Sequence, residues 1–293
     1  MRLLIVLAVF GFFAQLIDGA LGMAYGATSA TLVLAAGYSP ATASASVHLA
    51  EVATTFVSGV SHWRFGNVDW RTVRRIGIPG ATGAFLGAVV LSNISAELAK
   101  PWMAGILLAL GVYILLRFTL GRTPRPSGRP YVRFRYLVPL GASAGFVDAT
   151  GGGGWGAMST TTLLATGKME PRKVVGSVDT SEFLVSVSAS IAFLLALGSQ
   201  GVKPGVVIAL LAGGVVAAPI AAWLVQRITA RLLGAAVGGL IIITNVRTLF
   251  SVYEAGVETR ALVYAALVAG WMAAITIVVR HHRRNGLPLL NSA

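Results

Sequence analysis

The chain has 293 residues, of which 56% are hydrophobic and 11% are charged, and its mean hydropathy is +0.78. Soluble domains carry about 25% charged residues, so this composition excludes a soluble enzyme, a disordered chain and a collagen-like fibre. The absence of cysteine also excludes a disulfide-stapled secreted domain, thiolate catalysis and thiolate metal sites. The sequence therefore predicts a membrane protein.

The formal net charge of +13 would suggest a nucleic-acid partner in a soluble protein. In a multi-pass membrane protein, basic residues gather in cytoplasmic loops and set the orientation instead. We therefore expect a lipid bilayer, and no nucleic acid, as a partner of this chain.

Seven stretches are apolar and long enough to cross about 30 Å of hydrocarbon, and they lie at 41–61, 76–92, 101–120, 174–198, 204–225, 232–250 and 261–279. Two further apolar stretches, 3–37 and 136–167, are each interrupted by an acid and glycines. Because each half of these two stretches is short, we expect each to form a broken pair of helices that crosses the membrane or re-enters it.

The chain contains an internal repeat. An offset of 130 residues aligns rare intramembrane residue types: Asp18 with Asp148, Gly22 with Gly152, Gly26 with Gly156, Ser29 with Ser159 and Thr31 with Thr161. An offset of 131 aligns Pro40 with Pro171 and Glu51 with Glu182. We interpret this pattern as a duplicated unit of one broken helix pair and three spans.

The positive-inside rule indicates how the two copies are oriented. If each copy crosses the membrane an odd number of times, 18 of the 23 Lys and Arg residues fall on one face, whereas an even number places only 14 there. The sequence therefore predicts inverted repeats, with the N-terminus outside.

The predicted organisation is a first transmembrane repeat at 1–120, a basic cytoplasmic linker at 121–135 and a second repeat at 136–256. An extra transmembrane helix and a basic cytoplasmic tail follow at 257–293. Residues 1–17 resemble a signal peptide. We expect no cleavage there, because the stretch from Asp18 to Gly37 has its counterpart in the second copy.

Five acids interrupt the apolar sequence, and each ionised acid costs about 2.5–3.5 kcal/mol at the centre of a span. One interpretation is a water-accessible cavity whose carboxyl groups couple transport to a proton. In the other, Asp18 and Asp148 accept backbone N–H bonds at the glycine breaks, as helix caps do. The candidate proton-coupling residues are Asp18, His48, Glu51, Asp148, Asp179 and Glu182.

His48 and Asp179 occupy equivalent positions in the two copies, and each precedes a glutamate by three residues. That spacing places each pair on one helix face. Such pairs suit a proton relay or, alternatively, a site for a hard cation; a packed, hydrogen-bonded histidine is the simpler explanation. We assign no metal site or cofactor.

The run Gly151-Gly152-Gly153-Gly154 is incompatible with an ordinary helix, because glycine costs about 1 kcal/mol per residue in a helix interior. Such a break is tolerated at membrane depth only where it is buried in protein or lines a cavity. The helix beginning at Trp155 would direct its unpaired N–H groups toward an anion. The candidate substrate-binding residues are Gly22, Tyr25, Ser29, Gly151, Gly152, Gly153, Gly154, Trp155, Ser159 and Thr160.

The motif Gly145-Phe146-Val147-Asp148-Ala149-Thr150-Gly151-Gly152-Gly153-Gly154-Trp155-Gly156, with Glu170-Pro171-Arg172-Lys173 and Thr180-Ser181-Glu182-Phe183, resembles the TauE/SafE sulfite exporter family. The resemblance covers nearly the whole chain. It implies an all-α permease with two related halves that handles sulfite, sulfonates, thiosulfate or a similar organic anion.

From the sequence we therefore expect a multi-pass secondary transporter of the cell inner membrane that exports a small oxidised-sulfur anion, coupled to protons. We expect no enzyme activity, since no nucleophile–base pair or nucleotide motif is visible. The alternatives are a cation or metal-ion carrier and a membrane scaffold subunit that does not transport. Small-residue helix faces make a homodimer plausible.

Overall fold

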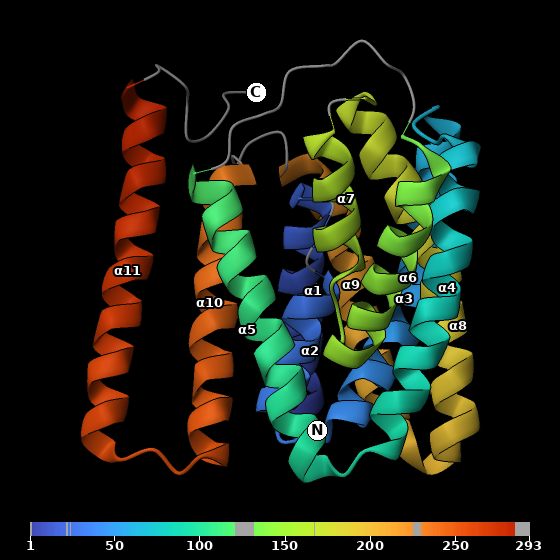
Figure 1. Cartoon of the computed structure of the whole chain (residues 1–293). Coiled ribbons are helices and arrows are strands. Elements are labelled where there is room, and N and C mark those ends of the chain that lie inside the picture. The colour runs from blue at the N-terminus through green and yellow to red at the C-terminus, as the bar shows by residue number, and fades with distance from the viewer. Residues whose placement is uncertain are drawn as a thin grey trace.

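The computed structural model describes the backbone of residues 2–21, 23, 25–120, 132–166, 168–224 and 230–284. These residues form an all-α protein without a strand (Figure 1). The helices are α1 (Arg2–Leu21), α2 (Tyr25–Ala35), α3 (Pro40–Arg64), α4 (Trp70–Asn93), α5 (Ala96–Leu120), α6 (Phe134–Gly151), α7 (Trp155–Ala165), α8 (Pro171–Gly201), α9 (Pro204–Leu224), α10 (Ala230–Val252) and α11 (Val257–Arg284). Residues 121–131 of the predicted linker lie outside the described part.

Five stretches are long and apolar enough to cross a membrane: Trp70–Asn93, Ala96–Leu120, Lys173–Gly198, Gly234–Val252 and Val257–Arg284. These stretches include five of the seven predicted spans, and the chain is a multi-pass membrane protein. Two predicted spans differ from this picture. The helix α3 is about 37 Å long, but its polar residues keep it below the hydropathy of the five, and within α9 the described apolar part is Pro204–Ala217.

Each predicted helix pair is broken where the glycines and acids occur, between α1 and α2 and between α6 and α7. The second pair, α6 and α7, forms a hairpin. The Arg75 guanidinium lies 5.6 Å from the ring centre of Phe134, at the start of α6, and the Thr72 hydroxyl lies 3.6 Å from the sulfur of Met169, just after α7. Both ends of the pair therefore lie beside the first turns of α4, at the upper end in Figure 1.

The first helix pair, α1 and α2, enters the protein from the opposite end of the molecule, and α1 packs against α9. Leu4 contacts Gly205 at the start of α9, whereas Gly11 lies against Leu210 farther along that helix. Thus α1 and α9 run side by side in the same direction, as α6 and α4 do on the other side of the protein. The N-terminus lies at the lower end in Figure 1. The first helix of each predicted copy thus packs against a helix of the other copy, α1 against α9 and α6 against α4. Two inverted copies would produce this arrangement, and the duplication itself stays a prediction.

Close packing between α4 and α6 depends on glycine. A β-carbon on Gly83 would overlap the carbonyl of Ala142, and one on Gly145 would overlap the carbonyl of Gly80. The isolated glycines of α4 thus serve helix packing, as their spacing predicts. This interface is part of one of two apolar cores, formed mainly by α4, α6, α7 and α8; the other is formed mainly by α1, α2, α5, α9 and α10.

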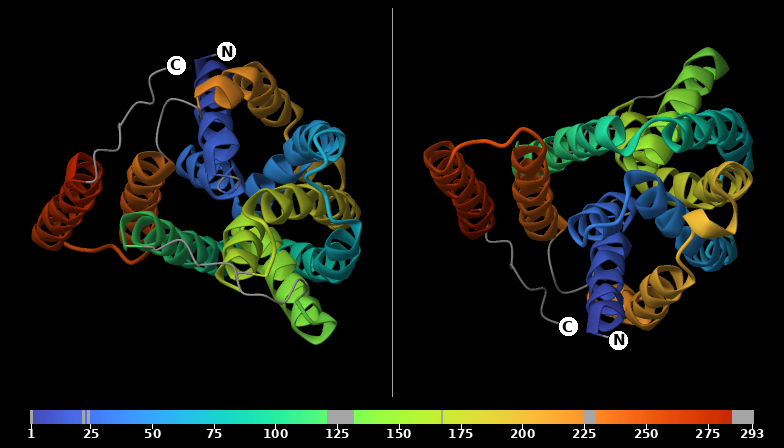
Figure 2. Two further views of the ribbon diagram at one scale, coloured as in Figure 1. Left: turned by 90° about the horizontal axis from the view of Figure 1, so that it is seen from above. Right: turned by 90° about the horizontal axis from the view of Figure 1, so that it is seen from below.

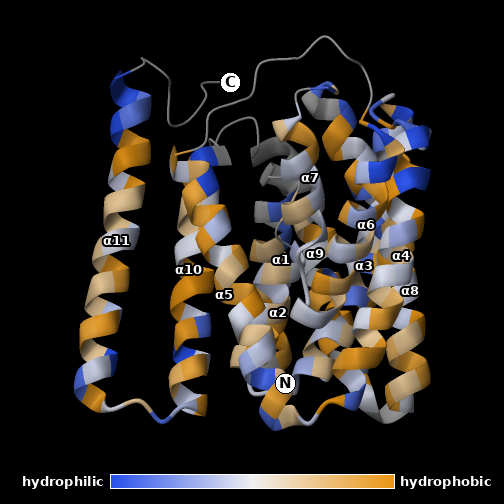
Figure 3. Ribbon diagram, in the orientation of Figure 1, coloured by the Kyte–Doolittle hydropathy of each residue, from blue (hydrophilic) through white to orange (hydrophobic). Residues whose placement is uncertain are grey.

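The helix α11 stands at the edge of the protein beside α10, as Figure 2 shows from above and below. The indole N–H of Trp271 donates to the carbonyl of Ala235 (3.0 Å), which attaches α11 to α10. Most of its described side chains are exposed, with Ala274, Val278 and His282 buried. Polar residues gather at its ends and apolar residues between them, as expected for a lipid-exposed span (Figure 3).

Candidate functional site

An aspartate caps the short helix that follows each break. The Tyr25 N–H donates to Oδ1 of Asp18 (3.2 Å), and the Trp155 N–H donates to Oδ1 of Asp148 (2.8 Å). Both aspartates precede the capped residue by seven positions, so the two breaks share one local design. The first N–H group of each short helix is thus satisfied by a carboxyl group of the protein itself.

The glycine run forms the turn between α6 and α7. Gly152 and Gly154 have positive φ angles of 72° and 146°, which glycine adopts without the strain of a β-carbon. A β-carbon on Gly153 would overlap the backbone of Gly26 and Ala27 at the start of α2. The glycine run of the second break therefore packs directly against the first residues of α2, which follow the first break.

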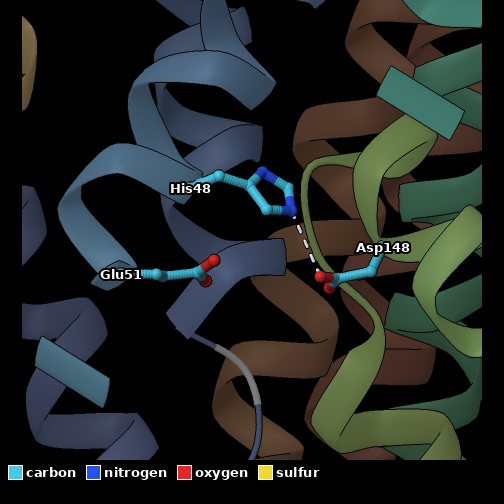
Figure 4. Close-up of side chains that lie close together, drawn as sticks. All are labelled: His48, Glu51 and Asp148. Atoms are coloured by element: carbon cyan, nitrogen blue, oxygen red, sulfur yellow. Dashed lines mark hydrogen bonds and ion pairs between the residues drawn. The ribbon is translucent and has the colours of Figure 1, made fainter. Parts of the chain in front are cut away.

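A buried ion pair joins α3 to this break. The His48 Nε2 atom lies 3.1 Å from Oδ2 of Asp148, and both side chains are at most 1% exposed (Figure 4). The other ring nitrogen, Nδ1, donates to the Ser44 carbonyl (2.8 Å). Whichever partner carries the proton between Nε2 and the carboxyl group, the pair is neutral overall.

Glu51 lies one turn beyond His48 and close to the same break (Figure 4). Its side chain is 2% exposed; Ser186 donates to Oε2 (3.5 Å), whereas Oε1 has no hydrogen-bond partner among the described residues. A β-carbon on Gly26 would lie 2.8 Å from this Oε1 atom and 2.8 Å from the Cα of Gly153. Gly26 therefore separates the carboxyl group from the glycine run.

The ligand-type atoms of His48, Glu51 and Asp148 lie within 4.8 Å of one another, which is compact enough for a metal ion. One histidine nitrogen faces a carboxyl oxygen and the other faces a backbone carbonyl. A metal-bound histidine also donates its second ring N–H to a backbone carbonyl, so the contact with Ser44 is common to an ion pair and to a metal site. The structure shows the direct Nε2–Oδ2 contact of an ion pair.

A small polar cavity lies between α1, α2, α3 and α8, and four of its lining residues are acids. Its volume is about 20 Å³, about the room that a single water needs. No lysine or arginine is among the described residues that line it. The lining residues are Gln15, Asp18, Tyr25, Glu51, Thr54, Thr55, Ser58, Asp179 and Glu182.

His62 lies at the upper end of this region, in the last turn of α3. Its Nε2 atom is 3.8 Å from Oδ2 of Asp179, and the two side chains are 27% and 13% exposed. The pair therefore lies between the buried carboxyl groups and the end of the molecule at which most of the basic residues gather.

The predicted equivalent positions of the two copies have different partners. His48 pairs with Asp148, whereas its predicted counterpart Asp179 lies near His62 and lines one small cavity with Asp18, the predicted counterpart of Asp148. Each set thus joins residues of both predicted copies, one as a histidine–aspartate pair and the other around the acid-lined cavity.

The remaining predicted site residues are mostly packed in the protein interior. The indole N–H of Trp155 donates to the Val178 carbonyl (3.1 Å), and its ring is fully buried in the core beside Gly80. The hydroxyls of Ser29, Ser159 and Thr160 are buried and have no partner among the described residues. Gly22 lies outside the described residues.

Sequence reasoning missed several polar residues in or beside the cavity: Gln15, Thr54, Thr55 and Ser58 line it, and His62 contacts Asp179 at its edge. The last four follow Glu51 on α3 at spacings that keep one helix face polar. That stripe was a readable signal within an otherwise apolar segment. For Gln15, no sequence pattern pointed to the cavity.

Comparison with known proteins agrees with this architecture. Residues 7–248 match the family described as sulfite exporter TauE/SafE. The chain is 52% identical over 281 residues to the probable membrane transporter protein YtnM of Bacillus subtilis, covering 95% of this chain and 93% of the relative. It is 34% identical over 106 residues to the probable membrane transporter protein YdhB of the same organism, covering 36% and 43%. No solved structure is similar to the chain. The chain thus belongs to the TauE/SafE sulfite exporter family and is a membrane transporter rather than an enzyme.

Proposed function

We propose that this protein is a proton-coupled secondary transporter of the cell inner membrane that exports a small anion, namely sulfite, a sulfonate or another oxidised sulfur compound. The observation that carries the proposal is the acid-lined cavity beside the contact between the two broken helix pairs. The family description, sulfite exporter, supports the class of substrate.

The cavity suits proton uptake because its four acids are crowded. Four ionised carboxylates at membrane depth would cost about 10–14 kcal/mol in total, and like charges that share a site disfavour joint ionisation. Protonation relieves both costs. Protonated carboxyl groups also become hydrogen-bond donors, whereas the Tyr25 and Thr54 hydroxyls donate to backbone carbonyls in this structure. An oxyanion would then meet donors rather than negative charges.

The glycine run is the proposed second part of the substrate site. Gly26 separates Oε1 of Glu51 from Gly153, so a substrate there would reach both the carboxyl group and the backbone of the glycine run, whose Gly152 and Gly153 N–H groups donate to the Asp148 carbonyl in this structure. Because Gly153 packs against Ala27, substrate entry requires the two breaks to move apart. Loss of a proton from Glu51 would then repel the anion and favour its release.

Within the cavity, Asp18 and Asp179 are the proposed site of the coupling proton, with Glu182 beside them. Their counterparts Asp148 and His48 already share a proton and are neutral, whereas two aspartates need a proton from outside the pair. The other titratable groups facing them are Tyr25, Glu51 and His62. His62 would exchange protons with the upper, basic end of the protein.

The membrane potential supports export of any negative charge that leaves in excess of the coupled protons, by about 2.3 kcal/mol per elementary charge per 100 mV. A monovalent anion that leaves with one proton is neutral overall and gains nothing from the potential, whereas a divalent anion such as fully ionised sulfite still carries one net charge outward. The positive-inside rule supports a cytoplasmic location for the upper end of the molecule, where most of the basic residues gather. Small-residue helix faces are compatible with a homodimer in the same membrane.

One observation favours a different substrate. The cavity has carboxylate, hydroxyl and amide oxygens but no basic side chain among its described lining residues, and such oxygens are the preferred ligands of hard cations. A cation carrier is therefore the second candidate function.

Thermal unfolding of the purified protein in detergent separates the two candidates, because a ligand of the folded state raises stability by RT ln(1 + [L]/Kd). We expect sulfite, thiosulfate or a sulfonate to raise Tm, more at pH 6 than at pH 8, and a bulky substitution in Gly151–Gly154 to abolish the shift. Shifts with Na⁺ or divalent cations alone, lost in Glu51→Gln or Glu182→Gln, would replace the anion with a cation.

A further inference from the structure

Three arginines lie on one face of α4, near its start. None of them lines the acid-lined cavity. Arg71, Arg74 and Arg75 follow spacings of three and four residues, so they share one helix face. Together with Ile78 and Phe134 they line a surface pocket of about 540 Å³. No acid is among these five residues.

Two exposed apolar side chains also line this arginine pocket. Ile78 and Phe134 are 60% and 55% exposed, and the guanidinium of Arg75 lies 5.6 Å from the ring centre of Phe134. The Arg74 Nε–H donates to the Trp70 carbonyl (3.3 Å), which holds that side chain along the start of the helix. The pocket therefore combines three positive charges with exposed hydrocarbon.

An apolar groove of about 440 Å³ continues from the pocket toward the membrane interior, and Ile78 lines both. Farther along α4 it is lined by Thr82, Phe85 and Leu86, with Leu184 on α8. The rise from Ile78 to Leu86 is about 12 Å. Figure 3 shows the change from hydrophilic to hydrophobic residues down α4.

We infer that the arginine pocket and this groove together form a binding site for one anionic phospholipid of the cytoplasmic leaflet. The phosphate would lie among the three guanidinium groups, and an acyl chain would lie along the groove. Arginine offers paired N–H donors that match phosphate oxygens. The pocket lies at the basic end of a membrane span, where anionic headgroups collect.

The groove distinguishes a lipid from a soluble anion. A free phosphate or a small transported anion would use the arginines alone, whereas a phospholipid also covers the exposed side chains of Ile78 (60%), Phe85 (37%) and Leu86 (55%). Charge and apolar surface are arranged in the order in which a phospholipid presents phosphate and chain. The site is independent of which substrate the protein transports.

Thermal unfolding in mixed micelles tests the site with phosphatidylglycerol, phosphatidylcholine or free glycerol phosphate as the probe. We expect phosphatidylglycerol to raise the Tm of the wild type more than the other two probes. The variant R71Q/R74Q/R75Q should weaken the apparent affinity for phosphatidylglycerol at least about tenfold, because each basic residue near the surface contributes roughly 1 kcal/mol.

The matched control is R280Q/R283Q/R284Q, which removes the same charge from the end of α11 and should keep the full shift. The variant R71K/R74K/R75K keeps the charge, so it separates a folding defect from lost phosphate recognition; it should bind with reduced affinity. Equal loss in the α11 control, equal shifts with phosphatidylcholine, or an equal shift with glycerol phosphate would each overturn the lipid site.

Discussion

The His48 Nε2 atom and the Asp148 Oδ2 atom lie 3.1 Å apart, although 100 positions separate the two residues in the chain. The same aspartate accepts the first N–H of α7 through Oδ1. One buried carboxyl group thus ties α3 to the break between α6 and α7 and fixes the direction in which α7 leaves the glycine run.

Removing His48 should therefore destabilise the protein strongly. His48→Ala leaves Asp148 buried without its partner, and breaking a buried ion pair costs about 3–5 kcal/mol. We expect a clear fall in Tm, measured by thermal unfolding in detergent. His281→Ala, which alters an exposed histidine on α11, should leave Tm unchanged. A His48→Ala protein as stable as the wild type would mean that the pair does not hold the break.

The contact between the two breaks predicts that Gly153→Ala blocks transport. The new methyl group would overlap the backbone of Ala27, so the two short helices could not approach each other. Gly105→Ala on α5 is the matched control, because no atom lies within 4 Å of a β-carbon there. We expect substrate flux into vesicles to be lost in the first variant and kept in the second. Normal flux in Gly153→Ala would refute the closed contact.

Replacement of Asp179, one member of the proposed proton pair, should change proton coupling and leave folding intact. Asp179→His recreates in the second copy the histidine that the first copy has at position 48, so its pair with Asp18 should become neutral and permanently protonated. We expect anion movement without the proton movement and pH dependence of the wild type. Asp179→Asn should likewise lose pH dependence. The readouts are flux and internal pH in the same vesicles.

Two outcomes decide this point. A wild type that moves the anion with no dependence on pH would contradict proton coupling as a whole. A proton-coupled wild type whose Asp179→His variant is equally coupled would instead remove Asp179 from the proton site. If Glu182→Gln also retains the wild-type pH dependence, Glu182 is not a coupling group either.

The absence of cysteine makes the orientation directly measurable. Ser95→Cys lies in the exposed turn between α4 and α5, and Arg283→Cys lies at the opposite end of the molecule, near the end of α11. A membrane-impermeant maleimide should label Ser95→Cys in intact cells and Arg283→Cys only after permeabilisation. Labelling of Arg283→Cys but not Ser95→Cys from outside would indicate the reverse orientation of the whole protein, and labelling of both from outside would indicate parallel copies.

Much of the architecture could be predicted from local pattern. The helices α7 and α2 begin at Trp155 and Tyr25, each directly after a predicted break, because glycine cannot sustain a helix and a nearby aspartate caps the next one. The helix α3, predicted as a span at 41–61, is not among the stretches that are apolar enough to cross a membrane, because its buried face carries polar side chains such as His48 and Glu51.

The pairing of side chains could not be predicted. His48 and Asp179 are equivalent in sequence, yet only the fold determines that one meets Asp148 and the other lines the cavity with Asp18. Trp155 follows the glycine run, which suggested a substrate contact, but its indole is packed against Gly80 and bonded to Val178. Such partners depend on the angles and positions at which α3, α4 and α8 cross. The spacing of residues along one helix gives no information about these crossings.

The most direct test of the account is to measure sulfite flux and internal pH together in proteoliposomes, with protein-free liposomes as the baseline. An imposed sulfite gradient should move protons with the anion in the wild type, and Asp179→Asn should abolish the proton movement. Sulfite flux above the baseline with no accompanying proton movement would contradict the coupling. The absence of any flux above the baseline would contradict sulfite as the substrate.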